Sequence, residues 1–171
     1  ERAVGQTLER FGQLDVMVNN AVNYTWGPLA QLSTEDWHKS LRGSLDVAFF
    51  GTRAAFRAMQ GRGGSIINMG SVAGLLGSPG LSAYGAAKAG LETLIEGIAH
   101  RFADKGPRAV LIKPGPTITP MTDGMNRKGL LWATPETIAA ITHARAYRGG
   151  SIAYAPGFWR YIMLIIRNLP G

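Results

Sequence analysis

Residues 71–88 read SVAGLLGSPGLSAYGAAK and carry a hydroxyl at Ser71, a phenol at Tyr84 and an ammonium at Lys88. Residues 83–104 have the composition of a helix, on which side chains four positions apart lie on one face, about 5–6 Å apart at Cβ. The ammonium of Lys88 favours the phenolate, so we expect the pKa of Tyr84 to lie below its usual value of about 10. Such a phenol can pass a proton to or from an oxygen that Ser71 holds.

The spacing of Tyr84 and Lys88 is weak evidence by itself, because a chain with five tyrosines and five lysines can contain one such pair by chance. A surface lysine beside a half-buried tyrosine has the same pattern. Three apolar runs make the assignment of a site more specific than this one pair does. LDVMV precedes residues 19–21, SIINM precedes residues 70–71, and RAVLIK precedes residues 114–115, and each run ends in a polar or glycine-rich turn. This arrangement predicts parallel strands with a ligand at their carboxyl ends.

Together these segments resemble the short-chain dehydrogenase/reductase family. The matching segments are LDVMVNNA, INMGSVAG, YGAAK and KPGPTITPM, in the family's order and spacing and over nearly the whole chain. The resemblance implies an α/β fold, a Rossmann-like doubly wound parallel sheet. It also implies NAD or NADP as cofactor and a reaction that interconverts a ketone and a secondary alcohol.

The resemblance also implies roles for single residues. Tyr84 would be the general acid/base, Lys88 would lower its pKa and hold the nicotinamide ribose, and Ser71 would orient the substrate oxygen. Ser44 stands where relatives have an asparagine that helps to hold a water leading to the lysine. Ser44 could still bind a water, or it could be a small helix-packing residue. The residues expected to contact the cofactor are Asn20, Ala21, Tyr84, Lys88, Pro114, Gly115, Thr117 and Thr119.

The chain departs from the family pattern in two further ways. Val22 replaces a glycine that lets the backbone pass close to the cofactor, so we expect it to crowd the adenosine side or shift the turn. No phosphate-binding loop stands upstream of Asn19. We therefore interpret residues 1–171 as a single, incomplete domain that lacks its first three strands. We expect the resulting unpaired strand edge to make this polypeptide aggregate or stay partly unfolded when alone.

The remaining elements follow from local signals. Residues 1–12 read as a helix that Gly12 ends, and Ser33 caps a long helix over residues 34–60. Thr134-Pro135-Glu136 starts another helix, and SIAYAP is the last strand. Lys113 is expected to reach solvent from the end of its strand rather than to act as a base.

Residues 115–133 resemble the family's substrate lid and are rich in apolar side chains. This composition favours an apolar or lipid-linked carbonyl or alcohol substrate, although simple packing on the domain explains it equally well. The tail at residues 157–171 is also apolar, with arginines at both ends of its apolar run, and is too short to span a bilayer. It resembles the subgroup that includes the reductase component of decaprenylphosphoryl-ribose epimerisation. Peripheral membrane contact and packing against a second subunit of a homo-oligomer both stay open.

Composition limits the other classes of function that the chain can have. The net charge of +7 is diffuse, and the short GRGG tract reads as a turn, so no nucleic-acid partner is expected. The absence of cysteine excludes disulfides and cysteine-based metal sites, and no metal is expected. We expect a cytoplasmic location, with membrane-surface contact as an alternative. A non-catalytic cofactor-binding or scaffold subunit is the rival function, and a membrane-bound assembly factor is a third.

Overall fold

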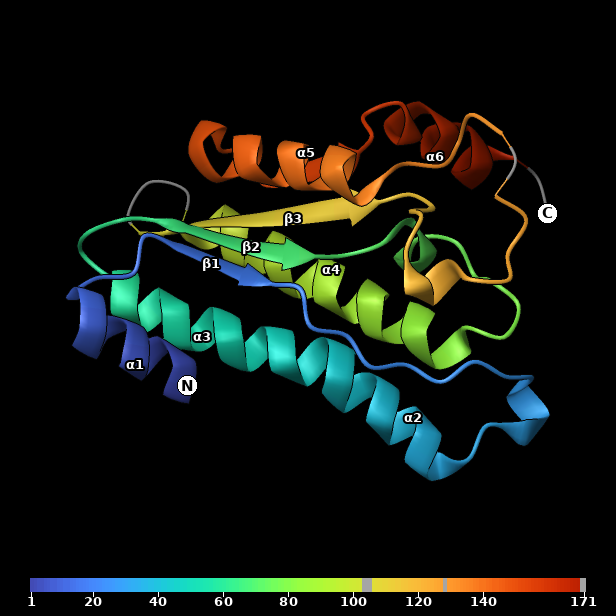
Figure 1. The fold of residues 1–171 in the computed structure, drawn as a ribbon, viewed down its shortest axis with the longest axis horizontal. Helices are drawn as coiled ribbons and strands as arrows, with labels where there is room; N and C mark the ends of the chain where they lie inside the picture. Colours follow the sequence, from blue (N-terminus) through green and yellow to red (C-terminus); the bar gives the residue numbers. More distant parts are fainter. Residues whose placement is uncertain (103–105, 128, 170–171) are drawn as a thin grey trace.

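The computed structural model describes residues 1–102, 106–127 and 129–169. Its centre is a sheet of four parallel strands in the order β1-β2-β3-β4 (Figure 1). The strands are β1 (Val16–Asn19), β2 (Ser65–Met69), β3 (Arg108–Pro114) and β4 (Ile152–Ala155). Because all four run in one direction, their carboxyl ends meet at one edge of the sheet, as the sequence predicts.

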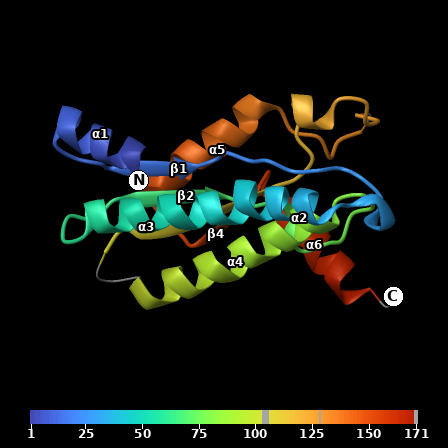
Figure 2. The same cartoon turned by 90° about the horizontal axis from the view of Figure 1, so that it is seen from below.

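Helices cover both faces of the sheet. α3 and α4 pack on one face, with α2 leading into α3 and α1 against α3, while α5 packs on the other face (Figures 1 and 2). The bounds of the helices are α1 (Arg2–Phe11), α2 (Thr34–Leu41), α3 (Val47–Met59), α4 (Ser82–Phe102), α5 (Pro135–Arg148) and α6 (Trp159–Asn168). This layering confirms the doubly wound α/β prediction.

Caps fix the helix ends where the sequence predicts them. Gly12 ends α1 with a φ of 73°, a left-handed conformation that glycine adopts at little steric cost. The Ser33 hydroxyl accepts a 3.1 Å hydrogen bond from the backbone N–H of Asp36 at the start of α2. Thr134 caps α5 in the same way, with Pro135 at its first position. The predicted end of the 83–104 helix lies partly outside the described residues.

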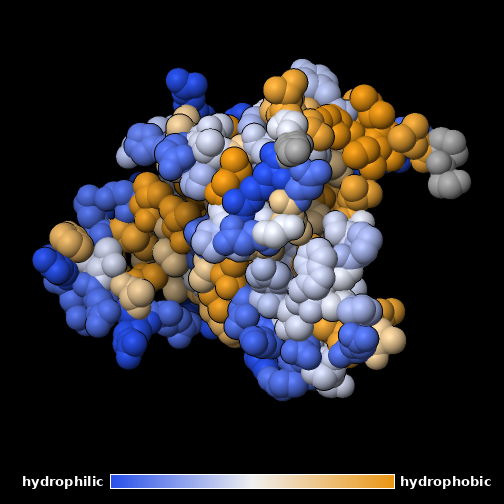
Figure 3. Space-filling view, turned by 45° about the vertical axis from the view of Figure 1, so that its right-hand side comes forward, coloured by the Kyte–Doolittle hydropathy of each residue, from blue (hydrophilic) through white to orange (hydrophobic). Residues whose placement is uncertain are grey.

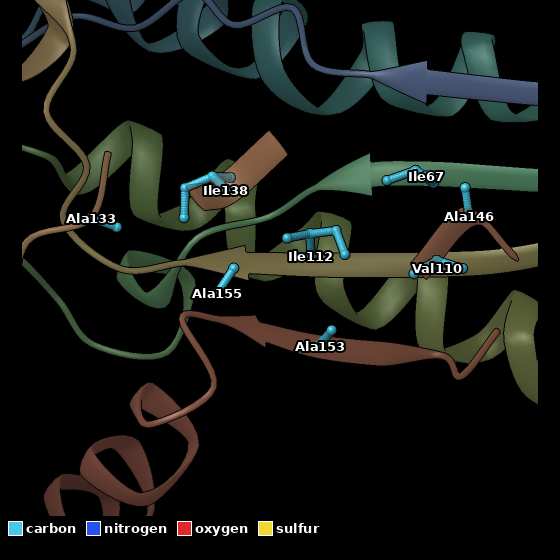
Figure 4. Close-up of a cluster of buried hydrophobic side chains, with 8 residues drawn as sticks. All are labelled: Ile67, Val110, Ile112, Ala133, Ile138, Ala146, Ala153 and Ala155. Carbon is cyan, nitrogen blue, oxygen red and sulfur yellow. The ribbon is translucent and has the colours of Figure 1, made fainter. Parts of the chain in front are cut away.

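The core lies on both faces of the sheet because β3 alternates its buried side chains. Val110 and Ile112 join the cluster beneath α5, whereas Ala109 and Leu111 pack with residues of α4. The cluster on the α5 side draws on β2, β3, β4 and α5, together with Ala133 from the loop before α5 (Figure 4). Its members are Ile67, Val110, Ile112, Ala133, Ile138, Ala146, Ala153 and Ala155.

The predicted helix over residues 34–60 is interrupted by a π-helical turn at Arg42–Asp46, between α2 and α3. The cause lies in the loop after β1. A Cβ on Gly43 would lie 2.3 Å from the Cβ of Asn23, and the Asn23 N–H donates to the Gly43 carbonyl at 3.1 Å. The helix therefore widens where this loop crosses it, a local contact that helix propensity does not encode.

The outer side of β1 is an edge. Among the described residues no strand pairs with it there, and Val18 is 45% exposed. The prediction that this strand is an open edge within residues 1–171 is confirmed. An open apolar edge is a surface that another strand can pair with.

Candidate active site

Ser71 and Tyr84 come together where β2 runs into α4. Ser71 follows β2 and caps the 3₁₀ turn Val72–Gly74, accepting a 3.1 Å hydrogen bond from the Ala73 N–H. This turn packs directly on α4 because a Cβ on Gly74 would lie 2.9 Å from the backbone of Lys88. The close approach brings the Ser71 side chain near enough to the Tyr84 phenol to lower the pKa of that phenol.

Lys88 lies one helical turn after Tyr84 and is buried. Its ammonium donates a 2.6 Å hydrogen bond to the carbonyl of Met69, the last residue of β2. The same nitrogen lies 5.6 Å from the centroid of the Tyr84 ring. Burial lowers the pKa of Lys88 to about 8, because the charged form loses its water. The sequence thus places Ser71, Tyr84 and Lys88 correctly as one group.

The prediction that Lys88 lowers the pKa of Tyr84 below its usual value is wrong. The pKa of Tyr84 is raised, chiefly because the phenol is buried, and the hydrogen bond with Ser71 lowers it in part. Tyr24 raises it further. Lys88 donates a hydrogen bond to the Met69 carbonyl and is not among the causes that shift the pKa of Tyr84. Tyr84 is therefore a neutral hydrogen-bond donor near pH 7.

Tyr24 is a site residue that the sequence analysis missed. Its ring packs edge-on against Tyr84, with the centroids 5.8 Å apart and the planes at 64°. Its hydroxyl donates to the carbonyl of Met121, in the expected lid, at 3.4 Å. Tyr24 therefore links the lid to the phenol. No sequence signal marks it, because it lies in a loop without periodicity.

Ser44 sits in the π-helical turn and is buried. Its hydroxyl donates a 2.9 Å hydrogen bond to the Asn23 carbonyl. Among the described residues this hydroxyl makes no hydrogen bond to Lys88. Ser44 therefore fixes the loop that carries Tyr24, and the water-holding role stays a prediction.

The turn after β1 exposes Asn20 and Ala21, while its first asparagine is buried. Asn19 donates from Nδ2 to the Asn68 side-chain oxygen at 2.9 Å and to the Thr52 hydroxyl at 3.1 Å. This network ties β1 to β2 and α3. Asn20 and Ala21 are thus free to contact a ligand at the edge of the sheet.

Val22, the departure from the family pattern, lies just beyond this turn. It is 42% exposed. Its side chain therefore points at least partly into solvent in the described chain.

The turn after β3 is shaped by a tryptophan from α6. Pro114 ends β3, and the N–H of Gly115 donates to the Ala155 carbonyl at 3.0 Å. A Cβ on Gly115 would lie 2.0 Å from Nε1 of Trp159, so only glycine fits there. Thr117 donates from its hydroxyl back to the Gly115 carbonyl at 3.0 Å, which tightens the turn.

Thr119 lies within the expected lid and is partly buried. Its carbonyl accepts a 2.9 Å hydrogen bond from Arg127 and a 3.0 Å hydrogen bond from the Thr122 hydroxyl. Arg127 also pairs with Asp123, which holds the lid together from within. The apolar lid residues that remain exposed are Ile118, Met125, Leu130 and Leu131.

The residues at this edge fit the nicotinamide end of NAD or NADP. Lys88 and Tyr84 can donate to ribose hydroxyls, and Thr117 and Thr119 can contact the carboxamide end, since these side chains meet at the carboxyl ends of β2 and β3. The indole Nε1 of Trp159 is buried beside this turn without a hydrogen-bond partner among the described residues. An unpaired buried donor at such an edge is consistent with a ligand site.

The family model for short chain dehydrogenases matches residues 1–129 of this chain. The chain belongs to the short-chain dehydrogenase family. It is 42% identical over 125 residues to a trans-4-hydroxycyclohexanecarboxylate dehydrogenase of Sinomonas cyclohexanicum, covering 73% of the chain and 48% of the relative. It is 34% identical over 136 residues to a 3-oxoacyl-[acyl-carrier-protein] reductase of Synechocystis, covering 79% of the chain and 55% of the relative. The chain thus spans about half the length of these curated relatives.

A solved structure agrees with this family membership. A gluconate 5-dehydrogenase of Burkholderia cenocepacia, in complex with NADP and tartrate, superposes with a TM-score of 0.80 at 25% identity. The match covers 94% of this chain and 70% of that one. The expected cofactor, NAD or NADP, and the Rossmann-like fold agree with this neighbour.

The expectation for Lys113 is wrong. Lys113 is 3% exposed and pairs with Glu92 of α4, beside the ring of Tyr154. Lys113 is enclosed beside Glu92 of α4 and Tyr154 of β4, so its charge requires a buried partner. Glu92 lies one turn after Lys88, which the sequence alone did not reveal as a partner.

The described residues contain no helix long and apolar enough to cross a membrane. They also contain no group of three acidic, histidine or cysteine side chains that could bind a metal ion.

Proposed function

We propose that the protein carrying this chain is an NAD(P)-dependent oxidoreductase that interconverts a ketone and a secondary alcohol. The observation that supports this most strongly is the grouping of Ser71, Tyr84 and Lys88 at the carboxyl end of β2. A hydroxyl that lies close to a neutral phenol can bind one carbonyl oxygen together with it.

The roles proposed for the residues follow from their surroundings. Tyr84 donates a proton to the carbonyl oxygen during reduction and takes it back during oxidation, and its raised pKa suits the donor role at neutral pH. Ser71 orients the same oxygen. Lys88, fixed by the Met69 carbonyl, holds the nicotinamide ribose and keeps a positive charge beside the phenol. When bound, the cofactor supplies or accepts the hydride.

The cofactor contacts are part of the same proposal. Asn20 and Ala21 flank one side of the site, and the turn after β3 flanks the other through Pro114, Gly115 and Thr117. Thr119 follows this turn within the lid. Ser44 supports the loop that carries Tyr24, because its hydroxyl holds the Asn23 carbonyl.

We propose an apolar carbonyl or alcohol as substrate. The lid next to Tyr24 exposes several apolar side chains, and Leu130 is 95% exposed. Exposed apolar groups of this kind are stabilised when an apolar ligand covers them. The similarity of the tail to the decaprenylphosphoryl-ribose subgroup supports the narrower proposal of a lipid-linked substrate.

A non-catalytic cofactor-binding subunit is the second candidate. Two features favour this candidate. Ser44 stands where relatives have the asparagine that helps to hold a water, and Val22 replaces a glycine in the turn after β1. The two functions differ in one measurement. An enzyme oxidises NADH or NADPH with at least one member of a ketone panel, whereas a scaffold subunit binds the cofactor without turnover.

The central test is Tyr84→Phe in the natural polypeptide that contains residues 1–171. We expect kcat to fall at least about 100-fold, within the range of general acid catalysis, while the cofactor Kd changes less than about three-fold. Tyr147→Phe is the matched control, because Tyr147 is exposed at the far end of α5. Activity that survives in Tyr84→Phe contradicts the catalytic assignment.

A further inference from the structure

α6 is apolar on its exposed side as well as on its buried side. Trp159 and Met163 face the protein and are buried. Tyr161, Leu164 and Ile165 are exposed by 67%, 62% and 61%. The surface beside the C-terminus in Figure 3 is correspondingly hydrophobic. A helix that exposes large apolar side chains opposite its buried face is stabilised by a second apolar environment in addition to its own domain.

The charged residues of α6 lie on one flank, whereas its one amide, Asn168, lies on the exposed side and donates to the Leu164 carbonyl at 2.7 Å. Arg160 and Arg167 are seven residues apart, and at 3.6 residues per turn this spacing places them on the same flank of the helix. Both are exposed, and within the described ranges neither forms an ion pair. α6 therefore presents an apolar stripe bordered by two unpaired cations.

The two arginines line a cavity of about 690 Å³ beside α4 and β4. Lys113 and Arg145 add two further cations to its lining, and Glu92 and Glu96 are its acidic residues. Because Lys113 is already paired with Glu92, one carboxylate remains opposite three arginines. The cavity is therefore suited to an anionic group.

A second copy of the chain is a poor occupant of this surface. A two-fold contact through α6 would bring the arginines of both copies toward one another at the same apolar stripe, and like charges opposed in an interface are unfavourable. An anionic lipid bilayer supplies both requirements, since its acyl boundary covers apolar side chains and its phosphates pair with arginines.

We infer that α6 and the basic cavity beside it form a docking surface for an anionic phospholipid bilayer. The helix lies in the plane of the membrane interface with Tyr161, Leu164 and Ile165 inserted. Arg160 and Arg167 contact lipid phosphates, and the cavity holds one headgroup phosphate. This docking does not depend on the proposed oxidoreductase activity.

The position of α6 connects this surface to the site. α6 follows β4 at the carboxyl end of the sheet, the end that also carries Ser71 and the lid (Figure 1). Trp159, the first residue of α6, packs against Gly115 in the turn after β3. A docked protein therefore holds this turn close to the membrane. If the proposed function holds as well, an apolar substrate can pass from the bilayer to the site.

The test is co-sedimentation of the natural polypeptide that contains residues 1–171 with vesicles. One vesicle is phosphatidylcholine alone, and the other contains 30% phosphatidylglycerol. We expect binding to the anionic vesicle, weakened by salt. Leu164→Glu with Ile165→Glu lowers the partition coefficient at least about ten-fold, because each adds a charge to the inserted stripe. Tyr147→Glu, an equally exposed position at the far end of α5, is the matched control and leaves binding unchanged.

A second pair of variants tests the electrostatic contribution of the arginines to vesicle binding. Arg160→Ala with Arg167→Ala lowers the partition coefficient roughly 30-fold on anionic vesicles, as expected for two interfacial arginines. Arg10→Ala with Arg57→Ala removes the same charge from exposed positions of α1 and α3 and changes binding less than about three-fold.

Three outcomes overturn the proposal. The first is equal binding to both vesicles, and the second is equal binding by the wild type and the α6 variants. The third is no vesicle binding together with a fall in oligomer size for Leu164→Glu with Ile165→Glu in light scattering, which identifies α6 as a contact between copies. Tyr84→Phe separates the two proposals, because it should abolish turnover and bind vesicles normally.

Discussion

The ammonium of Lys88 donates a 2.6 Å hydrogen bond to the carbonyl of Met69, and this contact ties α4 to the end of β2. The bond compensates in part for the burial of a charged group that is only 5% exposed. It also fixes the ammonium beside the Tyr84 ring instead of leaving it mobile. The position of the charge in the site is therefore set by the strand end rather than by the helix alone.

The burial of Lys88 predicts a pH dependence of stability. Its pKa falls from 10.5 in the unfolded chain to about 8 in the folded protein. Between these values the unfolded chain binds a proton that the folded protein does not, so stability rises with pH across this window. Below about pH 8 the penalty for burying the charge is fully present.

Lys88→Met removes this titration. We expect the difference in unfolding free energy, wild type minus Lys88→Met, to increase by about 2 kcal/mol between pH 7.5 and pH 9.5. Urea unfolding of both proteins at the two pH values measures it. A difference that stays constant, or that falls with rising pH, means that Lys88 keeps an ordinary pKa.

The contact between Tyr24 and Tyr84 predicts separate effects of the ring and the hydroxyl. Tyr24→Phe loses the long hydrogen bond to Met121, so we expect KM to rise about two-fold with kcat unchanged. Tyr24→Ala also loses the edge-on ring contact, so kcat falls about three- to ten-fold. Steady-state kinetics with a ketone substrate measures both.

The control for Tyr24 is Tyr147→Ala, which removes an exposed ring far from the lid. If Tyr24→Ala has the kinetic constants of the wild type, Tyr24 is not part of the site. If Tyr24→Phe and Tyr24→Ala lower kcat equally, the hydroxyl carries the effect and the ring contact does not.

The sequence predicted the elements whose causes are local. Gly12, Ser33 and Thr134 mark helix ends through their own backbone or side-chain chemistry, and the caps form as expected. The apolar runs predicted the three strands that end at the site. Tyr84 and Lys88 came together because helical spacing fixes their separation.

The features that the sequence missed depend on partners far along the chain. The π-helical turn at Arg42–Asp46 follows from a crossing by Asn23. The burial of Lys113 depends on Glu92, and the raised pKa of Tyr84 depends on how deeply the fold encloses it. Spacing patterns contain no information on such enclosure, which explains the wrong sign for the pKa.

The packing of Trp159 on Gly115 predicts a steric requirement for glycine. Gly115→Ala places a Cβ where the indole lies, so either α6 or the turn after β3 must move. We expect a loss of about 1–3 kcal/mol in unfolding free energy and weaker cofactor binding. Chemical denaturation and cofactor titration measure these effects in the natural polypeptide.

Gly27→Ala is the matched control for Gly115→Ala, because no atom lies within 4 Å of the added Cβ. We expect it to change the unfolding free energy by less than about 0.5 kcal/mol. Trp159→Leu in the Gly115→Ala background relieves the clash, so the two changes are not additive. Simple additivity of the two losses would show that the indole does not confine the turn.

The buried pair of Lys113 and Glu92 predicts a large asymmetry between single and double changes. The side chains are 4% and 13% exposed, so Glu92→Gln leaves a buried ammonium without its counter-charge. We expect Glu92→Gln to lower the unfolding free energy by about 3–5 kcal/mol. Lys113→Met with Glu92→Leu removes both charges, and its loss should be less than about 1 kcal/mol.

The matched control is Glu35→Gln, whose partner Arg42 is 57% exposed, so that the pair contributes less than about 1 kcal/mol. Thermal and urea unfolding of the four proteins at pH 7 distinguish the cases. Equal, small losses for Glu92→Gln and Glu35→Gln would mean that water reaches Lys113. In that event Lys113 and Glu92 both count as free charges in the lining of the cavity beside α6, and because they are opposite its net charge is unchanged.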